Sequence, residues 1–151
     1  MERLKDKVAV ITGGGLGIGR AIALRMAQEG ARVAILDLLD PEGEAAAADV
    51  AVRGGEARYW RCDVSNEQQV AEVFADVVRH FGRIDVLVNN AGVSGANKPT
   101  HELTEAEWDF VQGINVKGVF FCTKHAIPAL RAAGGGSIIN LSSIYGLVGA
   151  P

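Results

Sequence analysis

The stretch from Val8 to Gly19 constrains the fold more than any other part of this 151-residue sequence. Four apolar residues run directly into a glycine-rich turn, and an amphipathic segment from Arg20 to Glu29 follows at once. This order predicts a strand, a tight turn and a helix. Glycine permits positive φ in the turn and lets another group approach the backbone closely. The N–H groups at the start of the helix favour an anion as that group.

The glycine spacing in this turn is G-x-x-x-G-x-G, with Gly13, Gly17 and Gly19 at the fixed positions. It differs from the common dinucleotide fingerprint, and an ordinary strand-to-helix turn is the alternative on the motif alone. Asp37 favours the dinucleotide interpretation because it ends a second apolar run, 18 residues after Gly19. A carboxylate that accepts hydrogen bonds from an adenosine ribose lies at an offset of ~20 residues.

Asp37 also indicates which dinucleotide fits. A carboxylate at this place favours a free 2′-hydroxyl and repels a 2′-phosphate. Neither Leu16 nor Leu38 supplies a cation that could pair with such a phosphate. The sequence therefore predicts NAD rather than NADP.

Length, charge and composition narrow the class of protein. A chain of 151 residues suits one domain, so we expect residues 1–151 to form a single dinucleotide-binding domain. The net charge of −3 does not favour nucleic acid or an anionic membrane as a partner. The charged N-terminus has no apolar signal core behind it, and no run reaches membrane-spanning length. These features favour the cytoplasm.

The cysteines and histidines do not indicate a metal site. Cys62 and Cys122 lie 60 residues apart in apolar segments, which is typical of reduced core cysteines. His80, His101 and His125 lack the spacing of metal ligands. We expect them to be surface or hydrogen-bonded histidines.

Strand and helix patterns alternate along the chain. The predicted strands are Lys7–Thr12, Ala31–Asp37, Glu56–Cys62, Ile84–Asn89 and Ser137–Leu141. The predicted helices are Ile18–Glu29, Asp40 to about Gly54, Glu67–Phe81 and a long stretch from Thr104 to about Ala133, interrupted at Gly113, Gly118 and Pro128. Asp40 is a candidate cap, with Pro41 at the first helical position. Two pairs fit the capping-box pattern, Ser65 with Gln68 and Thr104 with Glu107.

This alternation predicts an α/β fold, a doubly wound parallel sheet of the Rossmann-like type. We expect at least five strands in the order 3-2-1-4-5. Ligands bind such sheets at the carboxyl ends of the strands. The polar residues at or just past these ends are Thr12, Asp37, Asp63, Asn89 and Ser142.

Taken together, these residues resemble the short-chain dehydrogenase/reductase family over essentially the whole chain. Thr12-Gly13-x-x-x-Gly17-Ile18-Gly19 resembles its cofactor loop, and Asp63, in Cys62-Asp63-Val64, matches the acidic residue that contacts the adenine ring. Asn89-Asn90-Ala91-Gly92 matches the motif that steadies the central sheet and passes along the cofactor. The predicted cofactor-binding residues are Gly13, Gly17, Ile18, Asp37, Asp63, Val64, Asn90, Ala91 and Gly92.

The resemblance also implies two catalytic residues. Asn115 matches the family's catalytic asparagine, and Ser143 matches the serine that hydrogen-bonds the substrate oxygen. Taken singly, Asn89 could be a turn former and Ser143 part of a polar strand end. The implied reaction is hydride transfer between NAD(H) and a small secondary alcohol or ketone. In the mechanism that the resemblance implies, a tyrosine acts as general acid/base and a lysine lowers the pKa of that tyrosine. The asparagine holds a water that relays protons.

The sequence departs from the family after Ser143. The family's Tyr-x-x-x-Lys motif is absent from the eight residues that follow, because Gly149 stands four residues after Tyr145. We expect Tyr145 either to line the substrate side or to pack in the core. The family's last two strands and the helix with the lysine are also missing.

Two explanations account for this departure. We expect the chain to be the N-terminal part of a longer oxidoreductase, since an end near Pro151 would leave the fifth strand with an unpaired apolar edge. The alternative is a catalytically inactive dinucleotide-binding or regulatory fragment. A flavodoxin-like signalling domain would not need Asn115 and Ser143 at these positions.

The resemblance further implies a homodimer or homotetramer built partly on the helix within Val116–Ala133. The apolar residues suited to this contact are Val119, Phe120, Phe121, Ile127 and Leu130, although core burial alone could explain them. The substrate's identity is not readable, and Ser94–Pro99 indicates only a flexible loop near the site.

Overall fold

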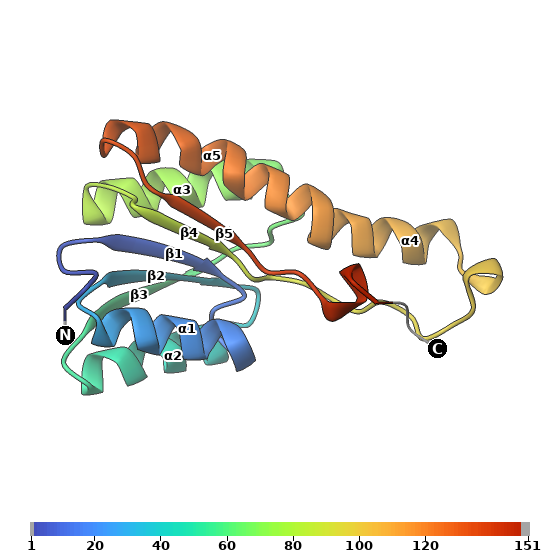
Figure 1. The fold of residues 1–151 in the computed structure, drawn as a ribbon, viewed down its shortest axis with the longest axis horizontal. Coiled ribbons are helices and arrows are strands. Elements are labelled where there is room, and N and C mark those ends of the chain that lie inside the picture. The colour runs from blue at the N-terminus through green and yellow to red at the C-terminus, as the bar shows by residue number, and fades with distance from the viewer. Residues whose placement is uncertain (1, 149–151) are drawn as a thin grey trace.

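The computed structural model describes residues 2–148, apart from the side chain of Tyr145. The interpretation of Tyr145, and its comparison with Gly149, therefore lie outside the described part. The chain forms one parallel five-stranded sheet in the order β3-β2-β1-β4-β5, so the predicted fold class and strand order are confirmed (Figure 1). The strands are β1 (Val8–Thr12), β2 (Arg32–Asp37), β3 (Glu56–Arg61), β4 (Val86–Asn89) and β5 (Ser137–Asn140).

Helices cover both faces of this sheet. They are α1 (Gly17–Gln28), α2 (Asp40–Val52), α3 (Glu67–Phe81), α4 (Glu105–Gln112) and α5 (Val119–Ala132). Helices α1 and α2 lie on one face and α3 and α5 on the other, while α4 continues in line with α5 beyond the sheet (Figure 1). Within residues 2–148, no helix combines the length and the apolar character needed to cross a membrane.

Two hydrophobic clusters fill the spaces between the sheet and its helices. In β1, Val8 and Val10 belong to the cluster under α3 and α5, whereas Ala9 and Ile11 belong to the cluster under α1 and α2. All four are fully buried. Burial on both faces explains why the central strands β1, β2 and β4 are almost continuously apolar, whereas β3 is not. Cys62 and Cys122 are free and buried, as predicted.

The start of α3 differs from the prediction. Glu67 is its first residue, as expected, but Asn66 is the N-cap and its side chain accepts from the N–H of Gln69 at 3.1 Å. Ser65 instead donates its hydroxyl to Asp63 at 2.7 Å. Asparagine caps a helix as well as serine does, and Asn66 directly precedes the first helical residue. The predicted Ser65 capping box is therefore wrong, whereas the Thr104–Glu107 box is present.

The start of α2 also differs. Asp40 is the first helical residue rather than the cap, and Leu39 occupies the N-cap without a side-chain hydrogen bond. The carboxylate of Asp40 is engaged by Tyr59 and Arg61 from β3. A tertiary contact thus replaces the expected local cap.

The long helical stretch contains a π-helical segment at Gly113–Gly118, which joins α4 to α5. A Cβ at Gly118 would lie 2.7 Å from Cγ2 of Val64, so glycine lets this segment approach the end of β3 closely. Pro128 lies inside α5 without ending it. π-Helical turns occur frequently at functional sites, and this one carries Asn115.

Candidate functional site

A groove of about 360 Å³ lies at the carboxyl ends of the central strands. Six of the residues predicted to bind a cofactor line it together, namely Gly13, Asp37, Asp63, Val64, Ala91 and Gly92. They come from the ends of β1, β2, β3 and β4. The parallel register places these ends side by side, as the order of the strands predicts. Gly17, Ile18 and Asn90 are not among the lining residues.

Two glycines of the loop after β1 meet different physical requirements. Gly17 has a φ of +51°, and a Cβ built there would meet no atom within 4 Å. A Cβ at Gly19 would lie 2.0 Å from the carbonyl oxygen of Gly13. Gly17 therefore permits a left-handed turn beside open space, whereas Gly19 permits close packing of the helix against the loop.

Helix α1 begins without a side-chain cap. Its N-cap, Leu16, makes no side-chain hydrogen bond, and the first turn contains no acidic residue. Ile18, in the same turn, is 66% exposed. The N–H groups of this turn and the positive end of the helix dipole are thus left for an anion.

Thr12 and Asn90 hold the glycine loop against the end of β4. The hydroxyl oxygen of Thr12 accepts from the backbone N–H of Asn90 at 3.1 Å and of Ala91 at 3.0 Å. The Asn90 amide donates to the carbonyls of Thr12 at 2.9 Å and Gly13 at 3.0 Å. Both amide hydrogens of Asn90 are used in this way, so its side chain shapes the loop.

Asn89 joins three elements beneath this site. Its buried amide donates to Oδ1 of Asn140 at 2.8 Å and to the hydroxyl of Thr123 at 3.2 Å. These bonds link β4 to β5 and to α5. A simple turn former would not need them, and they agree with a role in steadying the sheet.

Asp37 connects the glycine loop to the corner between β2 and α2. One carboxylate oxygen accepts from the N–H of Gly15 at 2.9 Å, and the other accepts from the N–H of Leu39 at 3.2 Å. The half-buried carboxylate is therefore oriented by backbone donors on two sides. Each oxygen keeps acceptor capacity toward the groove.

Three further residues meet at this corner, and the sequence did not indicate them as site residues. Tyr59 donates its hydroxyl to Oδ1 of Asp40 at 2.6 Å, and Arg61 donates to Oδ2 of Asp40 at 3.0 Å and to the carbonyl of Leu38 at 2.8 Å. The Tyr59 hydroxyl bond, followed by the charge of Arg61, holds the pKa of Asp40 below its ordinary value. Burial and the Asp40 carboxylate raise the pKa of Tyr59. The i, i+2 spacing of Tyr59 and Arg61 is the sequence signal, because it places both on one face of β3.

Asp63 lies where β3 gives way to α3. One of its carboxylate oxygens accepts from the N–H of Ser65 at 2.9 Å and from the hydroxyl of Ser65 at 2.7 Å. Its own N–H donates to the side chain of Gln69 at 2.7 Å. The loop is thereby fixed with the second carboxylate oxygen of Asp63 left for another donor.

Asn115 is attached to the wall of the groove. Its Oδ1 accepts from the N–H of Val93 at 2.9 Å, and its Nδ2 donates to the carbonyl of Val93 at 2.8 Å. Val93 lines the groove, so Asn115 lies beside it and keeps one amide hydrogen beyond this pair. Ser143 lies three residues past β5 in an exposed turn, where its carbonyl accepts from Gly146. Ser143 is not among the residues that line the groove.

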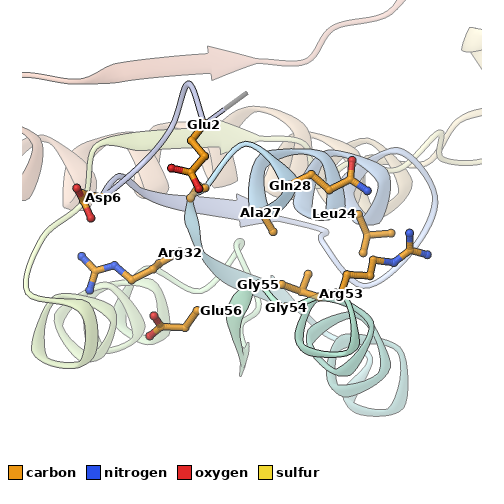
Figure 2. A pocket seen from close by; sticks show the side chains of 13 residues that line it. Glu2, Asp6, Leu24, Ala27, Gln28, Arg32, Arg53, Gly54, Gly55 and Glu56 are labelled. Atoms are coloured by element: carbon orange, nitrogen blue, oxygen red, sulfur yellow. The ribbon is translucent and has the colours of Figure 1, made fainter.

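A second cavity, of about 430 Å³, lies at the opposite end of the sheet (Figure 2). Arg32 at the start of β2 and Glu56 at the start of β3 line it, together with Glu2, Asp6 and Arg53. It contains none of the predicted site residues and faces the amino ends of the strands. Among residues 2–148, no three histidine, cysteine or carboxylate side chains gather closely enough to hold a metal ion.

Comparison with known families decides the relationship of this chain. The short chain dehydrogenase family matches residues 7–151. The chain belongs to this family. Its glycine loop, its groove and the Asn115–Val93 pair are therefore features of a short chain dehydrogenase.

Individual relatives agree with this assignment. The 3beta-hydroxysteroid dehydrogenase of Mediterraneibacter gnavus is 38% identical over 151 residues, which are 100% of this chain and 54% of that protein. The crystal structure of NAD⁺-bound xylitol dehydrogenase superposes with a TM-score of 0.95 at 40% identity, covering 99% of this chain and 57% of the other. A metagenomic short-chain oxidoreductase in complex with NADP gives a TM-score of 0.89 at 39% identity, covering 93% and 63%.

The matches cover nearly all of this chain but only part of each relative. This short chain dehydrogenase chain spans little more than half the length of the relatives it matches. The neighbours include one NAD⁺ complex and one NADP complex. Similarity therefore supports a nicotinamide dinucleotide as the ligand of the family. It does not distinguish NAD from NADP for this chain.

Proposed function

We propose that this chain is the cofactor-binding part of an NAD(H)-dependent oxidoreductase that interconverts a secondary alcohol and a ketone. The observation that carries the proposal is the Asp37 carboxylate, held at the groove by the N–H groups of Gly15 and Leu39. A carboxylate oriented in this way accepts from ribose hydroxyls and repels a 2′-phosphate. The dehydrogenases among the relatives favour an enzyme over an inactive fragment.

The residues present fit such a ligand in three places. The uncapped start of α1 and the open space at Gly17 would take the phosphates. Asp37 would hold the adenosine ribose, and Asp63 and Val64 would contact the adenine. Ala91 and Gly92 leave room along the groove toward Asn115. When bound, the dinucleotide supplies or accepts a hydride at its nicotinamide ring.

Two residues of this chain would act on the substrate and its protons. In this proposal Ser143 donates a hydrogen bond to the reacting oxygen. Asn115 has one amide hydrogen left beyond its bonds to Val93, which suits it to hold a water. The 151 residues lack a Tyr-x-x-x-Lys pair after Ser143, so the complete reaction needs a base from outside them.

Calorimetric titration of the purified protein with NAD⁺ and NADP⁺ tests the proposal. We expect saturable binding of both or of NAD⁺ alone, with NAD⁺ the tighter ligand. A panel of secondary alcohols then tests for reduced nicotinamide. Because these residues supply no Tyr-x-x-x-Lys pair, binding without turnover is the expected result for this chain alone. Turnover by this chain would contradict the need for an outside base, and no binding of either dinucleotide would contradict the proposal.

The same proposal includes a homodimer or homotetramer that associates partly through α5. Phe120 and Ile127 on this helix are 58% and 42% exposed, whereas Leu130 is buried and Phe121 packs against the core. Burial inside the subunit thus explains Leu130 and Phe121 but not the other two. The cytoplasmic location stays a prediction from the sequence.

A further inference from the structure

A cation lies next to the proposed ribose site. Arg61 donates to the carbonyl of Leu38 at 2.8 Å, and Leu38 directly follows Asp37 and lines the same groove. The sequence suggested that a 2′-phosphate would find no partner, because Leu16 and Leu38 are apolar. The tertiary structure brings Arg61 to this place from β3, where it pairs in register with Asp37.

This cation is itself neutralised. The carboxylate of Asp40 accepts from Arg61 at 3.0 Å and from the Tyr59 hydroxyl at 2.6 Å. Both side chains of the ion pair are about half exposed, at 57% for Arg61 and 51% for Asp40. Asp37, Asp40 and Arg61 together carry a net charge of −1 beside the proposed ribose.

We propose that Asp40 is a specificity-determining residue that disfavours NADP by keeping Arg61 paired. The inference rests on the proposed function. Removing the charge of Asp40 leaves Asp37 balanced by Arg61, with a local charge of zero, and the guanidinium stays near by its bond to Leu38. Removing Arg61 leaves two carboxylates and a local charge of −2. The two halves of one ion pair therefore act on a 2′-phosphate in opposite directions.

The competing explanation is that the pair only anchors α2. In that case Asp40→Asn and Arg61→Ala break the same contact and have the same effect. Both variants would then weaken the binding of NAD⁺ and of NADP⁺ by the same factor. The ratio of the two dissociation constants would stay unchanged. The sign of the change in this ratio separates the two explanations.

The experiment measures Kd for NAD⁺ and NADP⁺ by calorimetry in the purified protein. We expect the ratio of Kd for NADP⁺ to Kd for NAD⁺ to fall roughly two- to fivefold in Asp40→Asn, the range for an exposed ion pair. The ratio should rise by a similar factor in Arg61→Ala. The double variant, whose local charge is again −1, should return to near the wild-type ratio.

Two matched controls isolate charge from shape. Tyr59→Phe removes a hydrogen bond of Asp40 without changing the charge, and Arg61→Lys keeps the cation, so both should preserve the ratio. The shifts should shrink in high salt, because added ions screen exposed charges. Thermal unfolding monitored by circular dichroism checks that each variant is folded. If Asp40→Asn does not fold, the comparison of Arg61→Ala with Arg61→Lys tests the inference. The ratio of Kd for NADP⁺ to Kd for NAD⁺ should rise in Arg61→Ala and stay unchanged in Arg61→Lys.

Changes of the ratio in the same direction in Asp40→Asn and Arg61→Ala, or no change in either, would overturn the inference. A wild-type protein that binds neither dinucleotide would instead contradict the proposed function, and this inference with it. A wild-type protein that binds NAD⁺ while the variants leave the ratio unchanged would contradict the role of Asp40 alone.

Discussion

Gly19 lies so close to the carbonyl of Gly13 that any larger residue would overlap with backbone. A Cβ there would also come within 2.5 Å of the Asn90 amide, which is committed to the loop. We expect Gly19→Ala to lower the free energy of unfolding by about 3 kcal/mol, the upper range for overpacking. Urea unfolding measures this loss.

Gly54 provides the control for this substitution. It has a φ of +80° with open space around its Cβ position, so Gly54→Ala introduces backbone strain without a clash. We expect a cost of about 1 kcal/mol. Equal losses for the two variants would mean that backbone conformation, and not close packing, explains the need for Gly19.

Asp37 gives the second prediction at the scale of the residue. Asp37→Asn keeps the size of the side chain but removes its charge. We expect NAD⁺ affinity to fall about tenfold, because a hydrogen bond to a charged group contributes about 1.5 kcal/mol or more. The affinity for NADP⁺ should fall less, because the repulsion between the Asp37 carboxylate and the 2′-phosphate also disappears. An unchanged ratio of the two dissociation constants would refute the assignment of Asp37.

The contacts of single residues were predictable where they followed from local sequence. Gly13, Asp37 and Asp63 were expected at one site because each ends or follows a strand, and they line one groove. The pairing of Asp40 with Arg61 was not expected. It depends on β3 lying beside β2 with Arg61 opposite Asp37, which no local pattern reports.

At the scale of the element, Asp85 joins the start of β1 to the start of β4. Its carboxylate is 4% exposed and accepts from the N–H of Val8 at 3.0 Å, from Lys7 at 3.3 Å and from Arg83 at 2.6 Å. Burial alone would raise the pKa of Asp85, but these three donors outweigh it and lower the pKa. The ionised carboxylate therefore stabilises the fold.

This arrangement predicts a pH-dependent stability. A lowered pKa in the folded state means that the stabilisation is complete above the unfolded value of about 3.9 and is lost as the pH falls below it. We expect Asp85→Asn to cost about 1–3 kcal/mol at pH 7. The difference in the free energy of unfolding between the variant and the wild type, measured by urea unfolding, should be smaller at pH 3. An equal gap at both pH values would show that the charge of Asp85 is not responsible.

The helix boundaries show how far local signals reach. Thr104 and Glu107 cap α4 as expected, because both partners lie within one turn. Ser65 is not the cap because the helix begins one residue later than the capping box requires, and Asn66 occupies the N-cap. The glycines Gly113 and Gly118 marked an irregularity correctly, but a π-helical segment and not a break was the result.

At the scale of the whole molecule, the exposed side chains of α5 lead to a prediction about assembly. Burying a carboxylate without a partner costs several kcal/mol. We expect Phe120→Glu to weaken self-association at least tenfold, measured by sedimentation velocity. Val52→Glu on α2 is the control, because Val52 is 88% exposed and lies on the other face of the sheet. Equal behaviour of the two variants would contradict association through α5.

The sequence by itself determined the strands, their order and the glycine loop. Hydrophobic period, turn glycines and the handedness of crossovers act locally or between neighbours in the chain. Only the tertiary structure decided which side chains meet across strands. The bonds of Asp85 to Val8, Asn90 to Thr12 and Arg61 to Asp40 span 77, 78 and 21 residues. Such contacts depend on strand register and on the distance between strands, and these exist only once the sheet has formed.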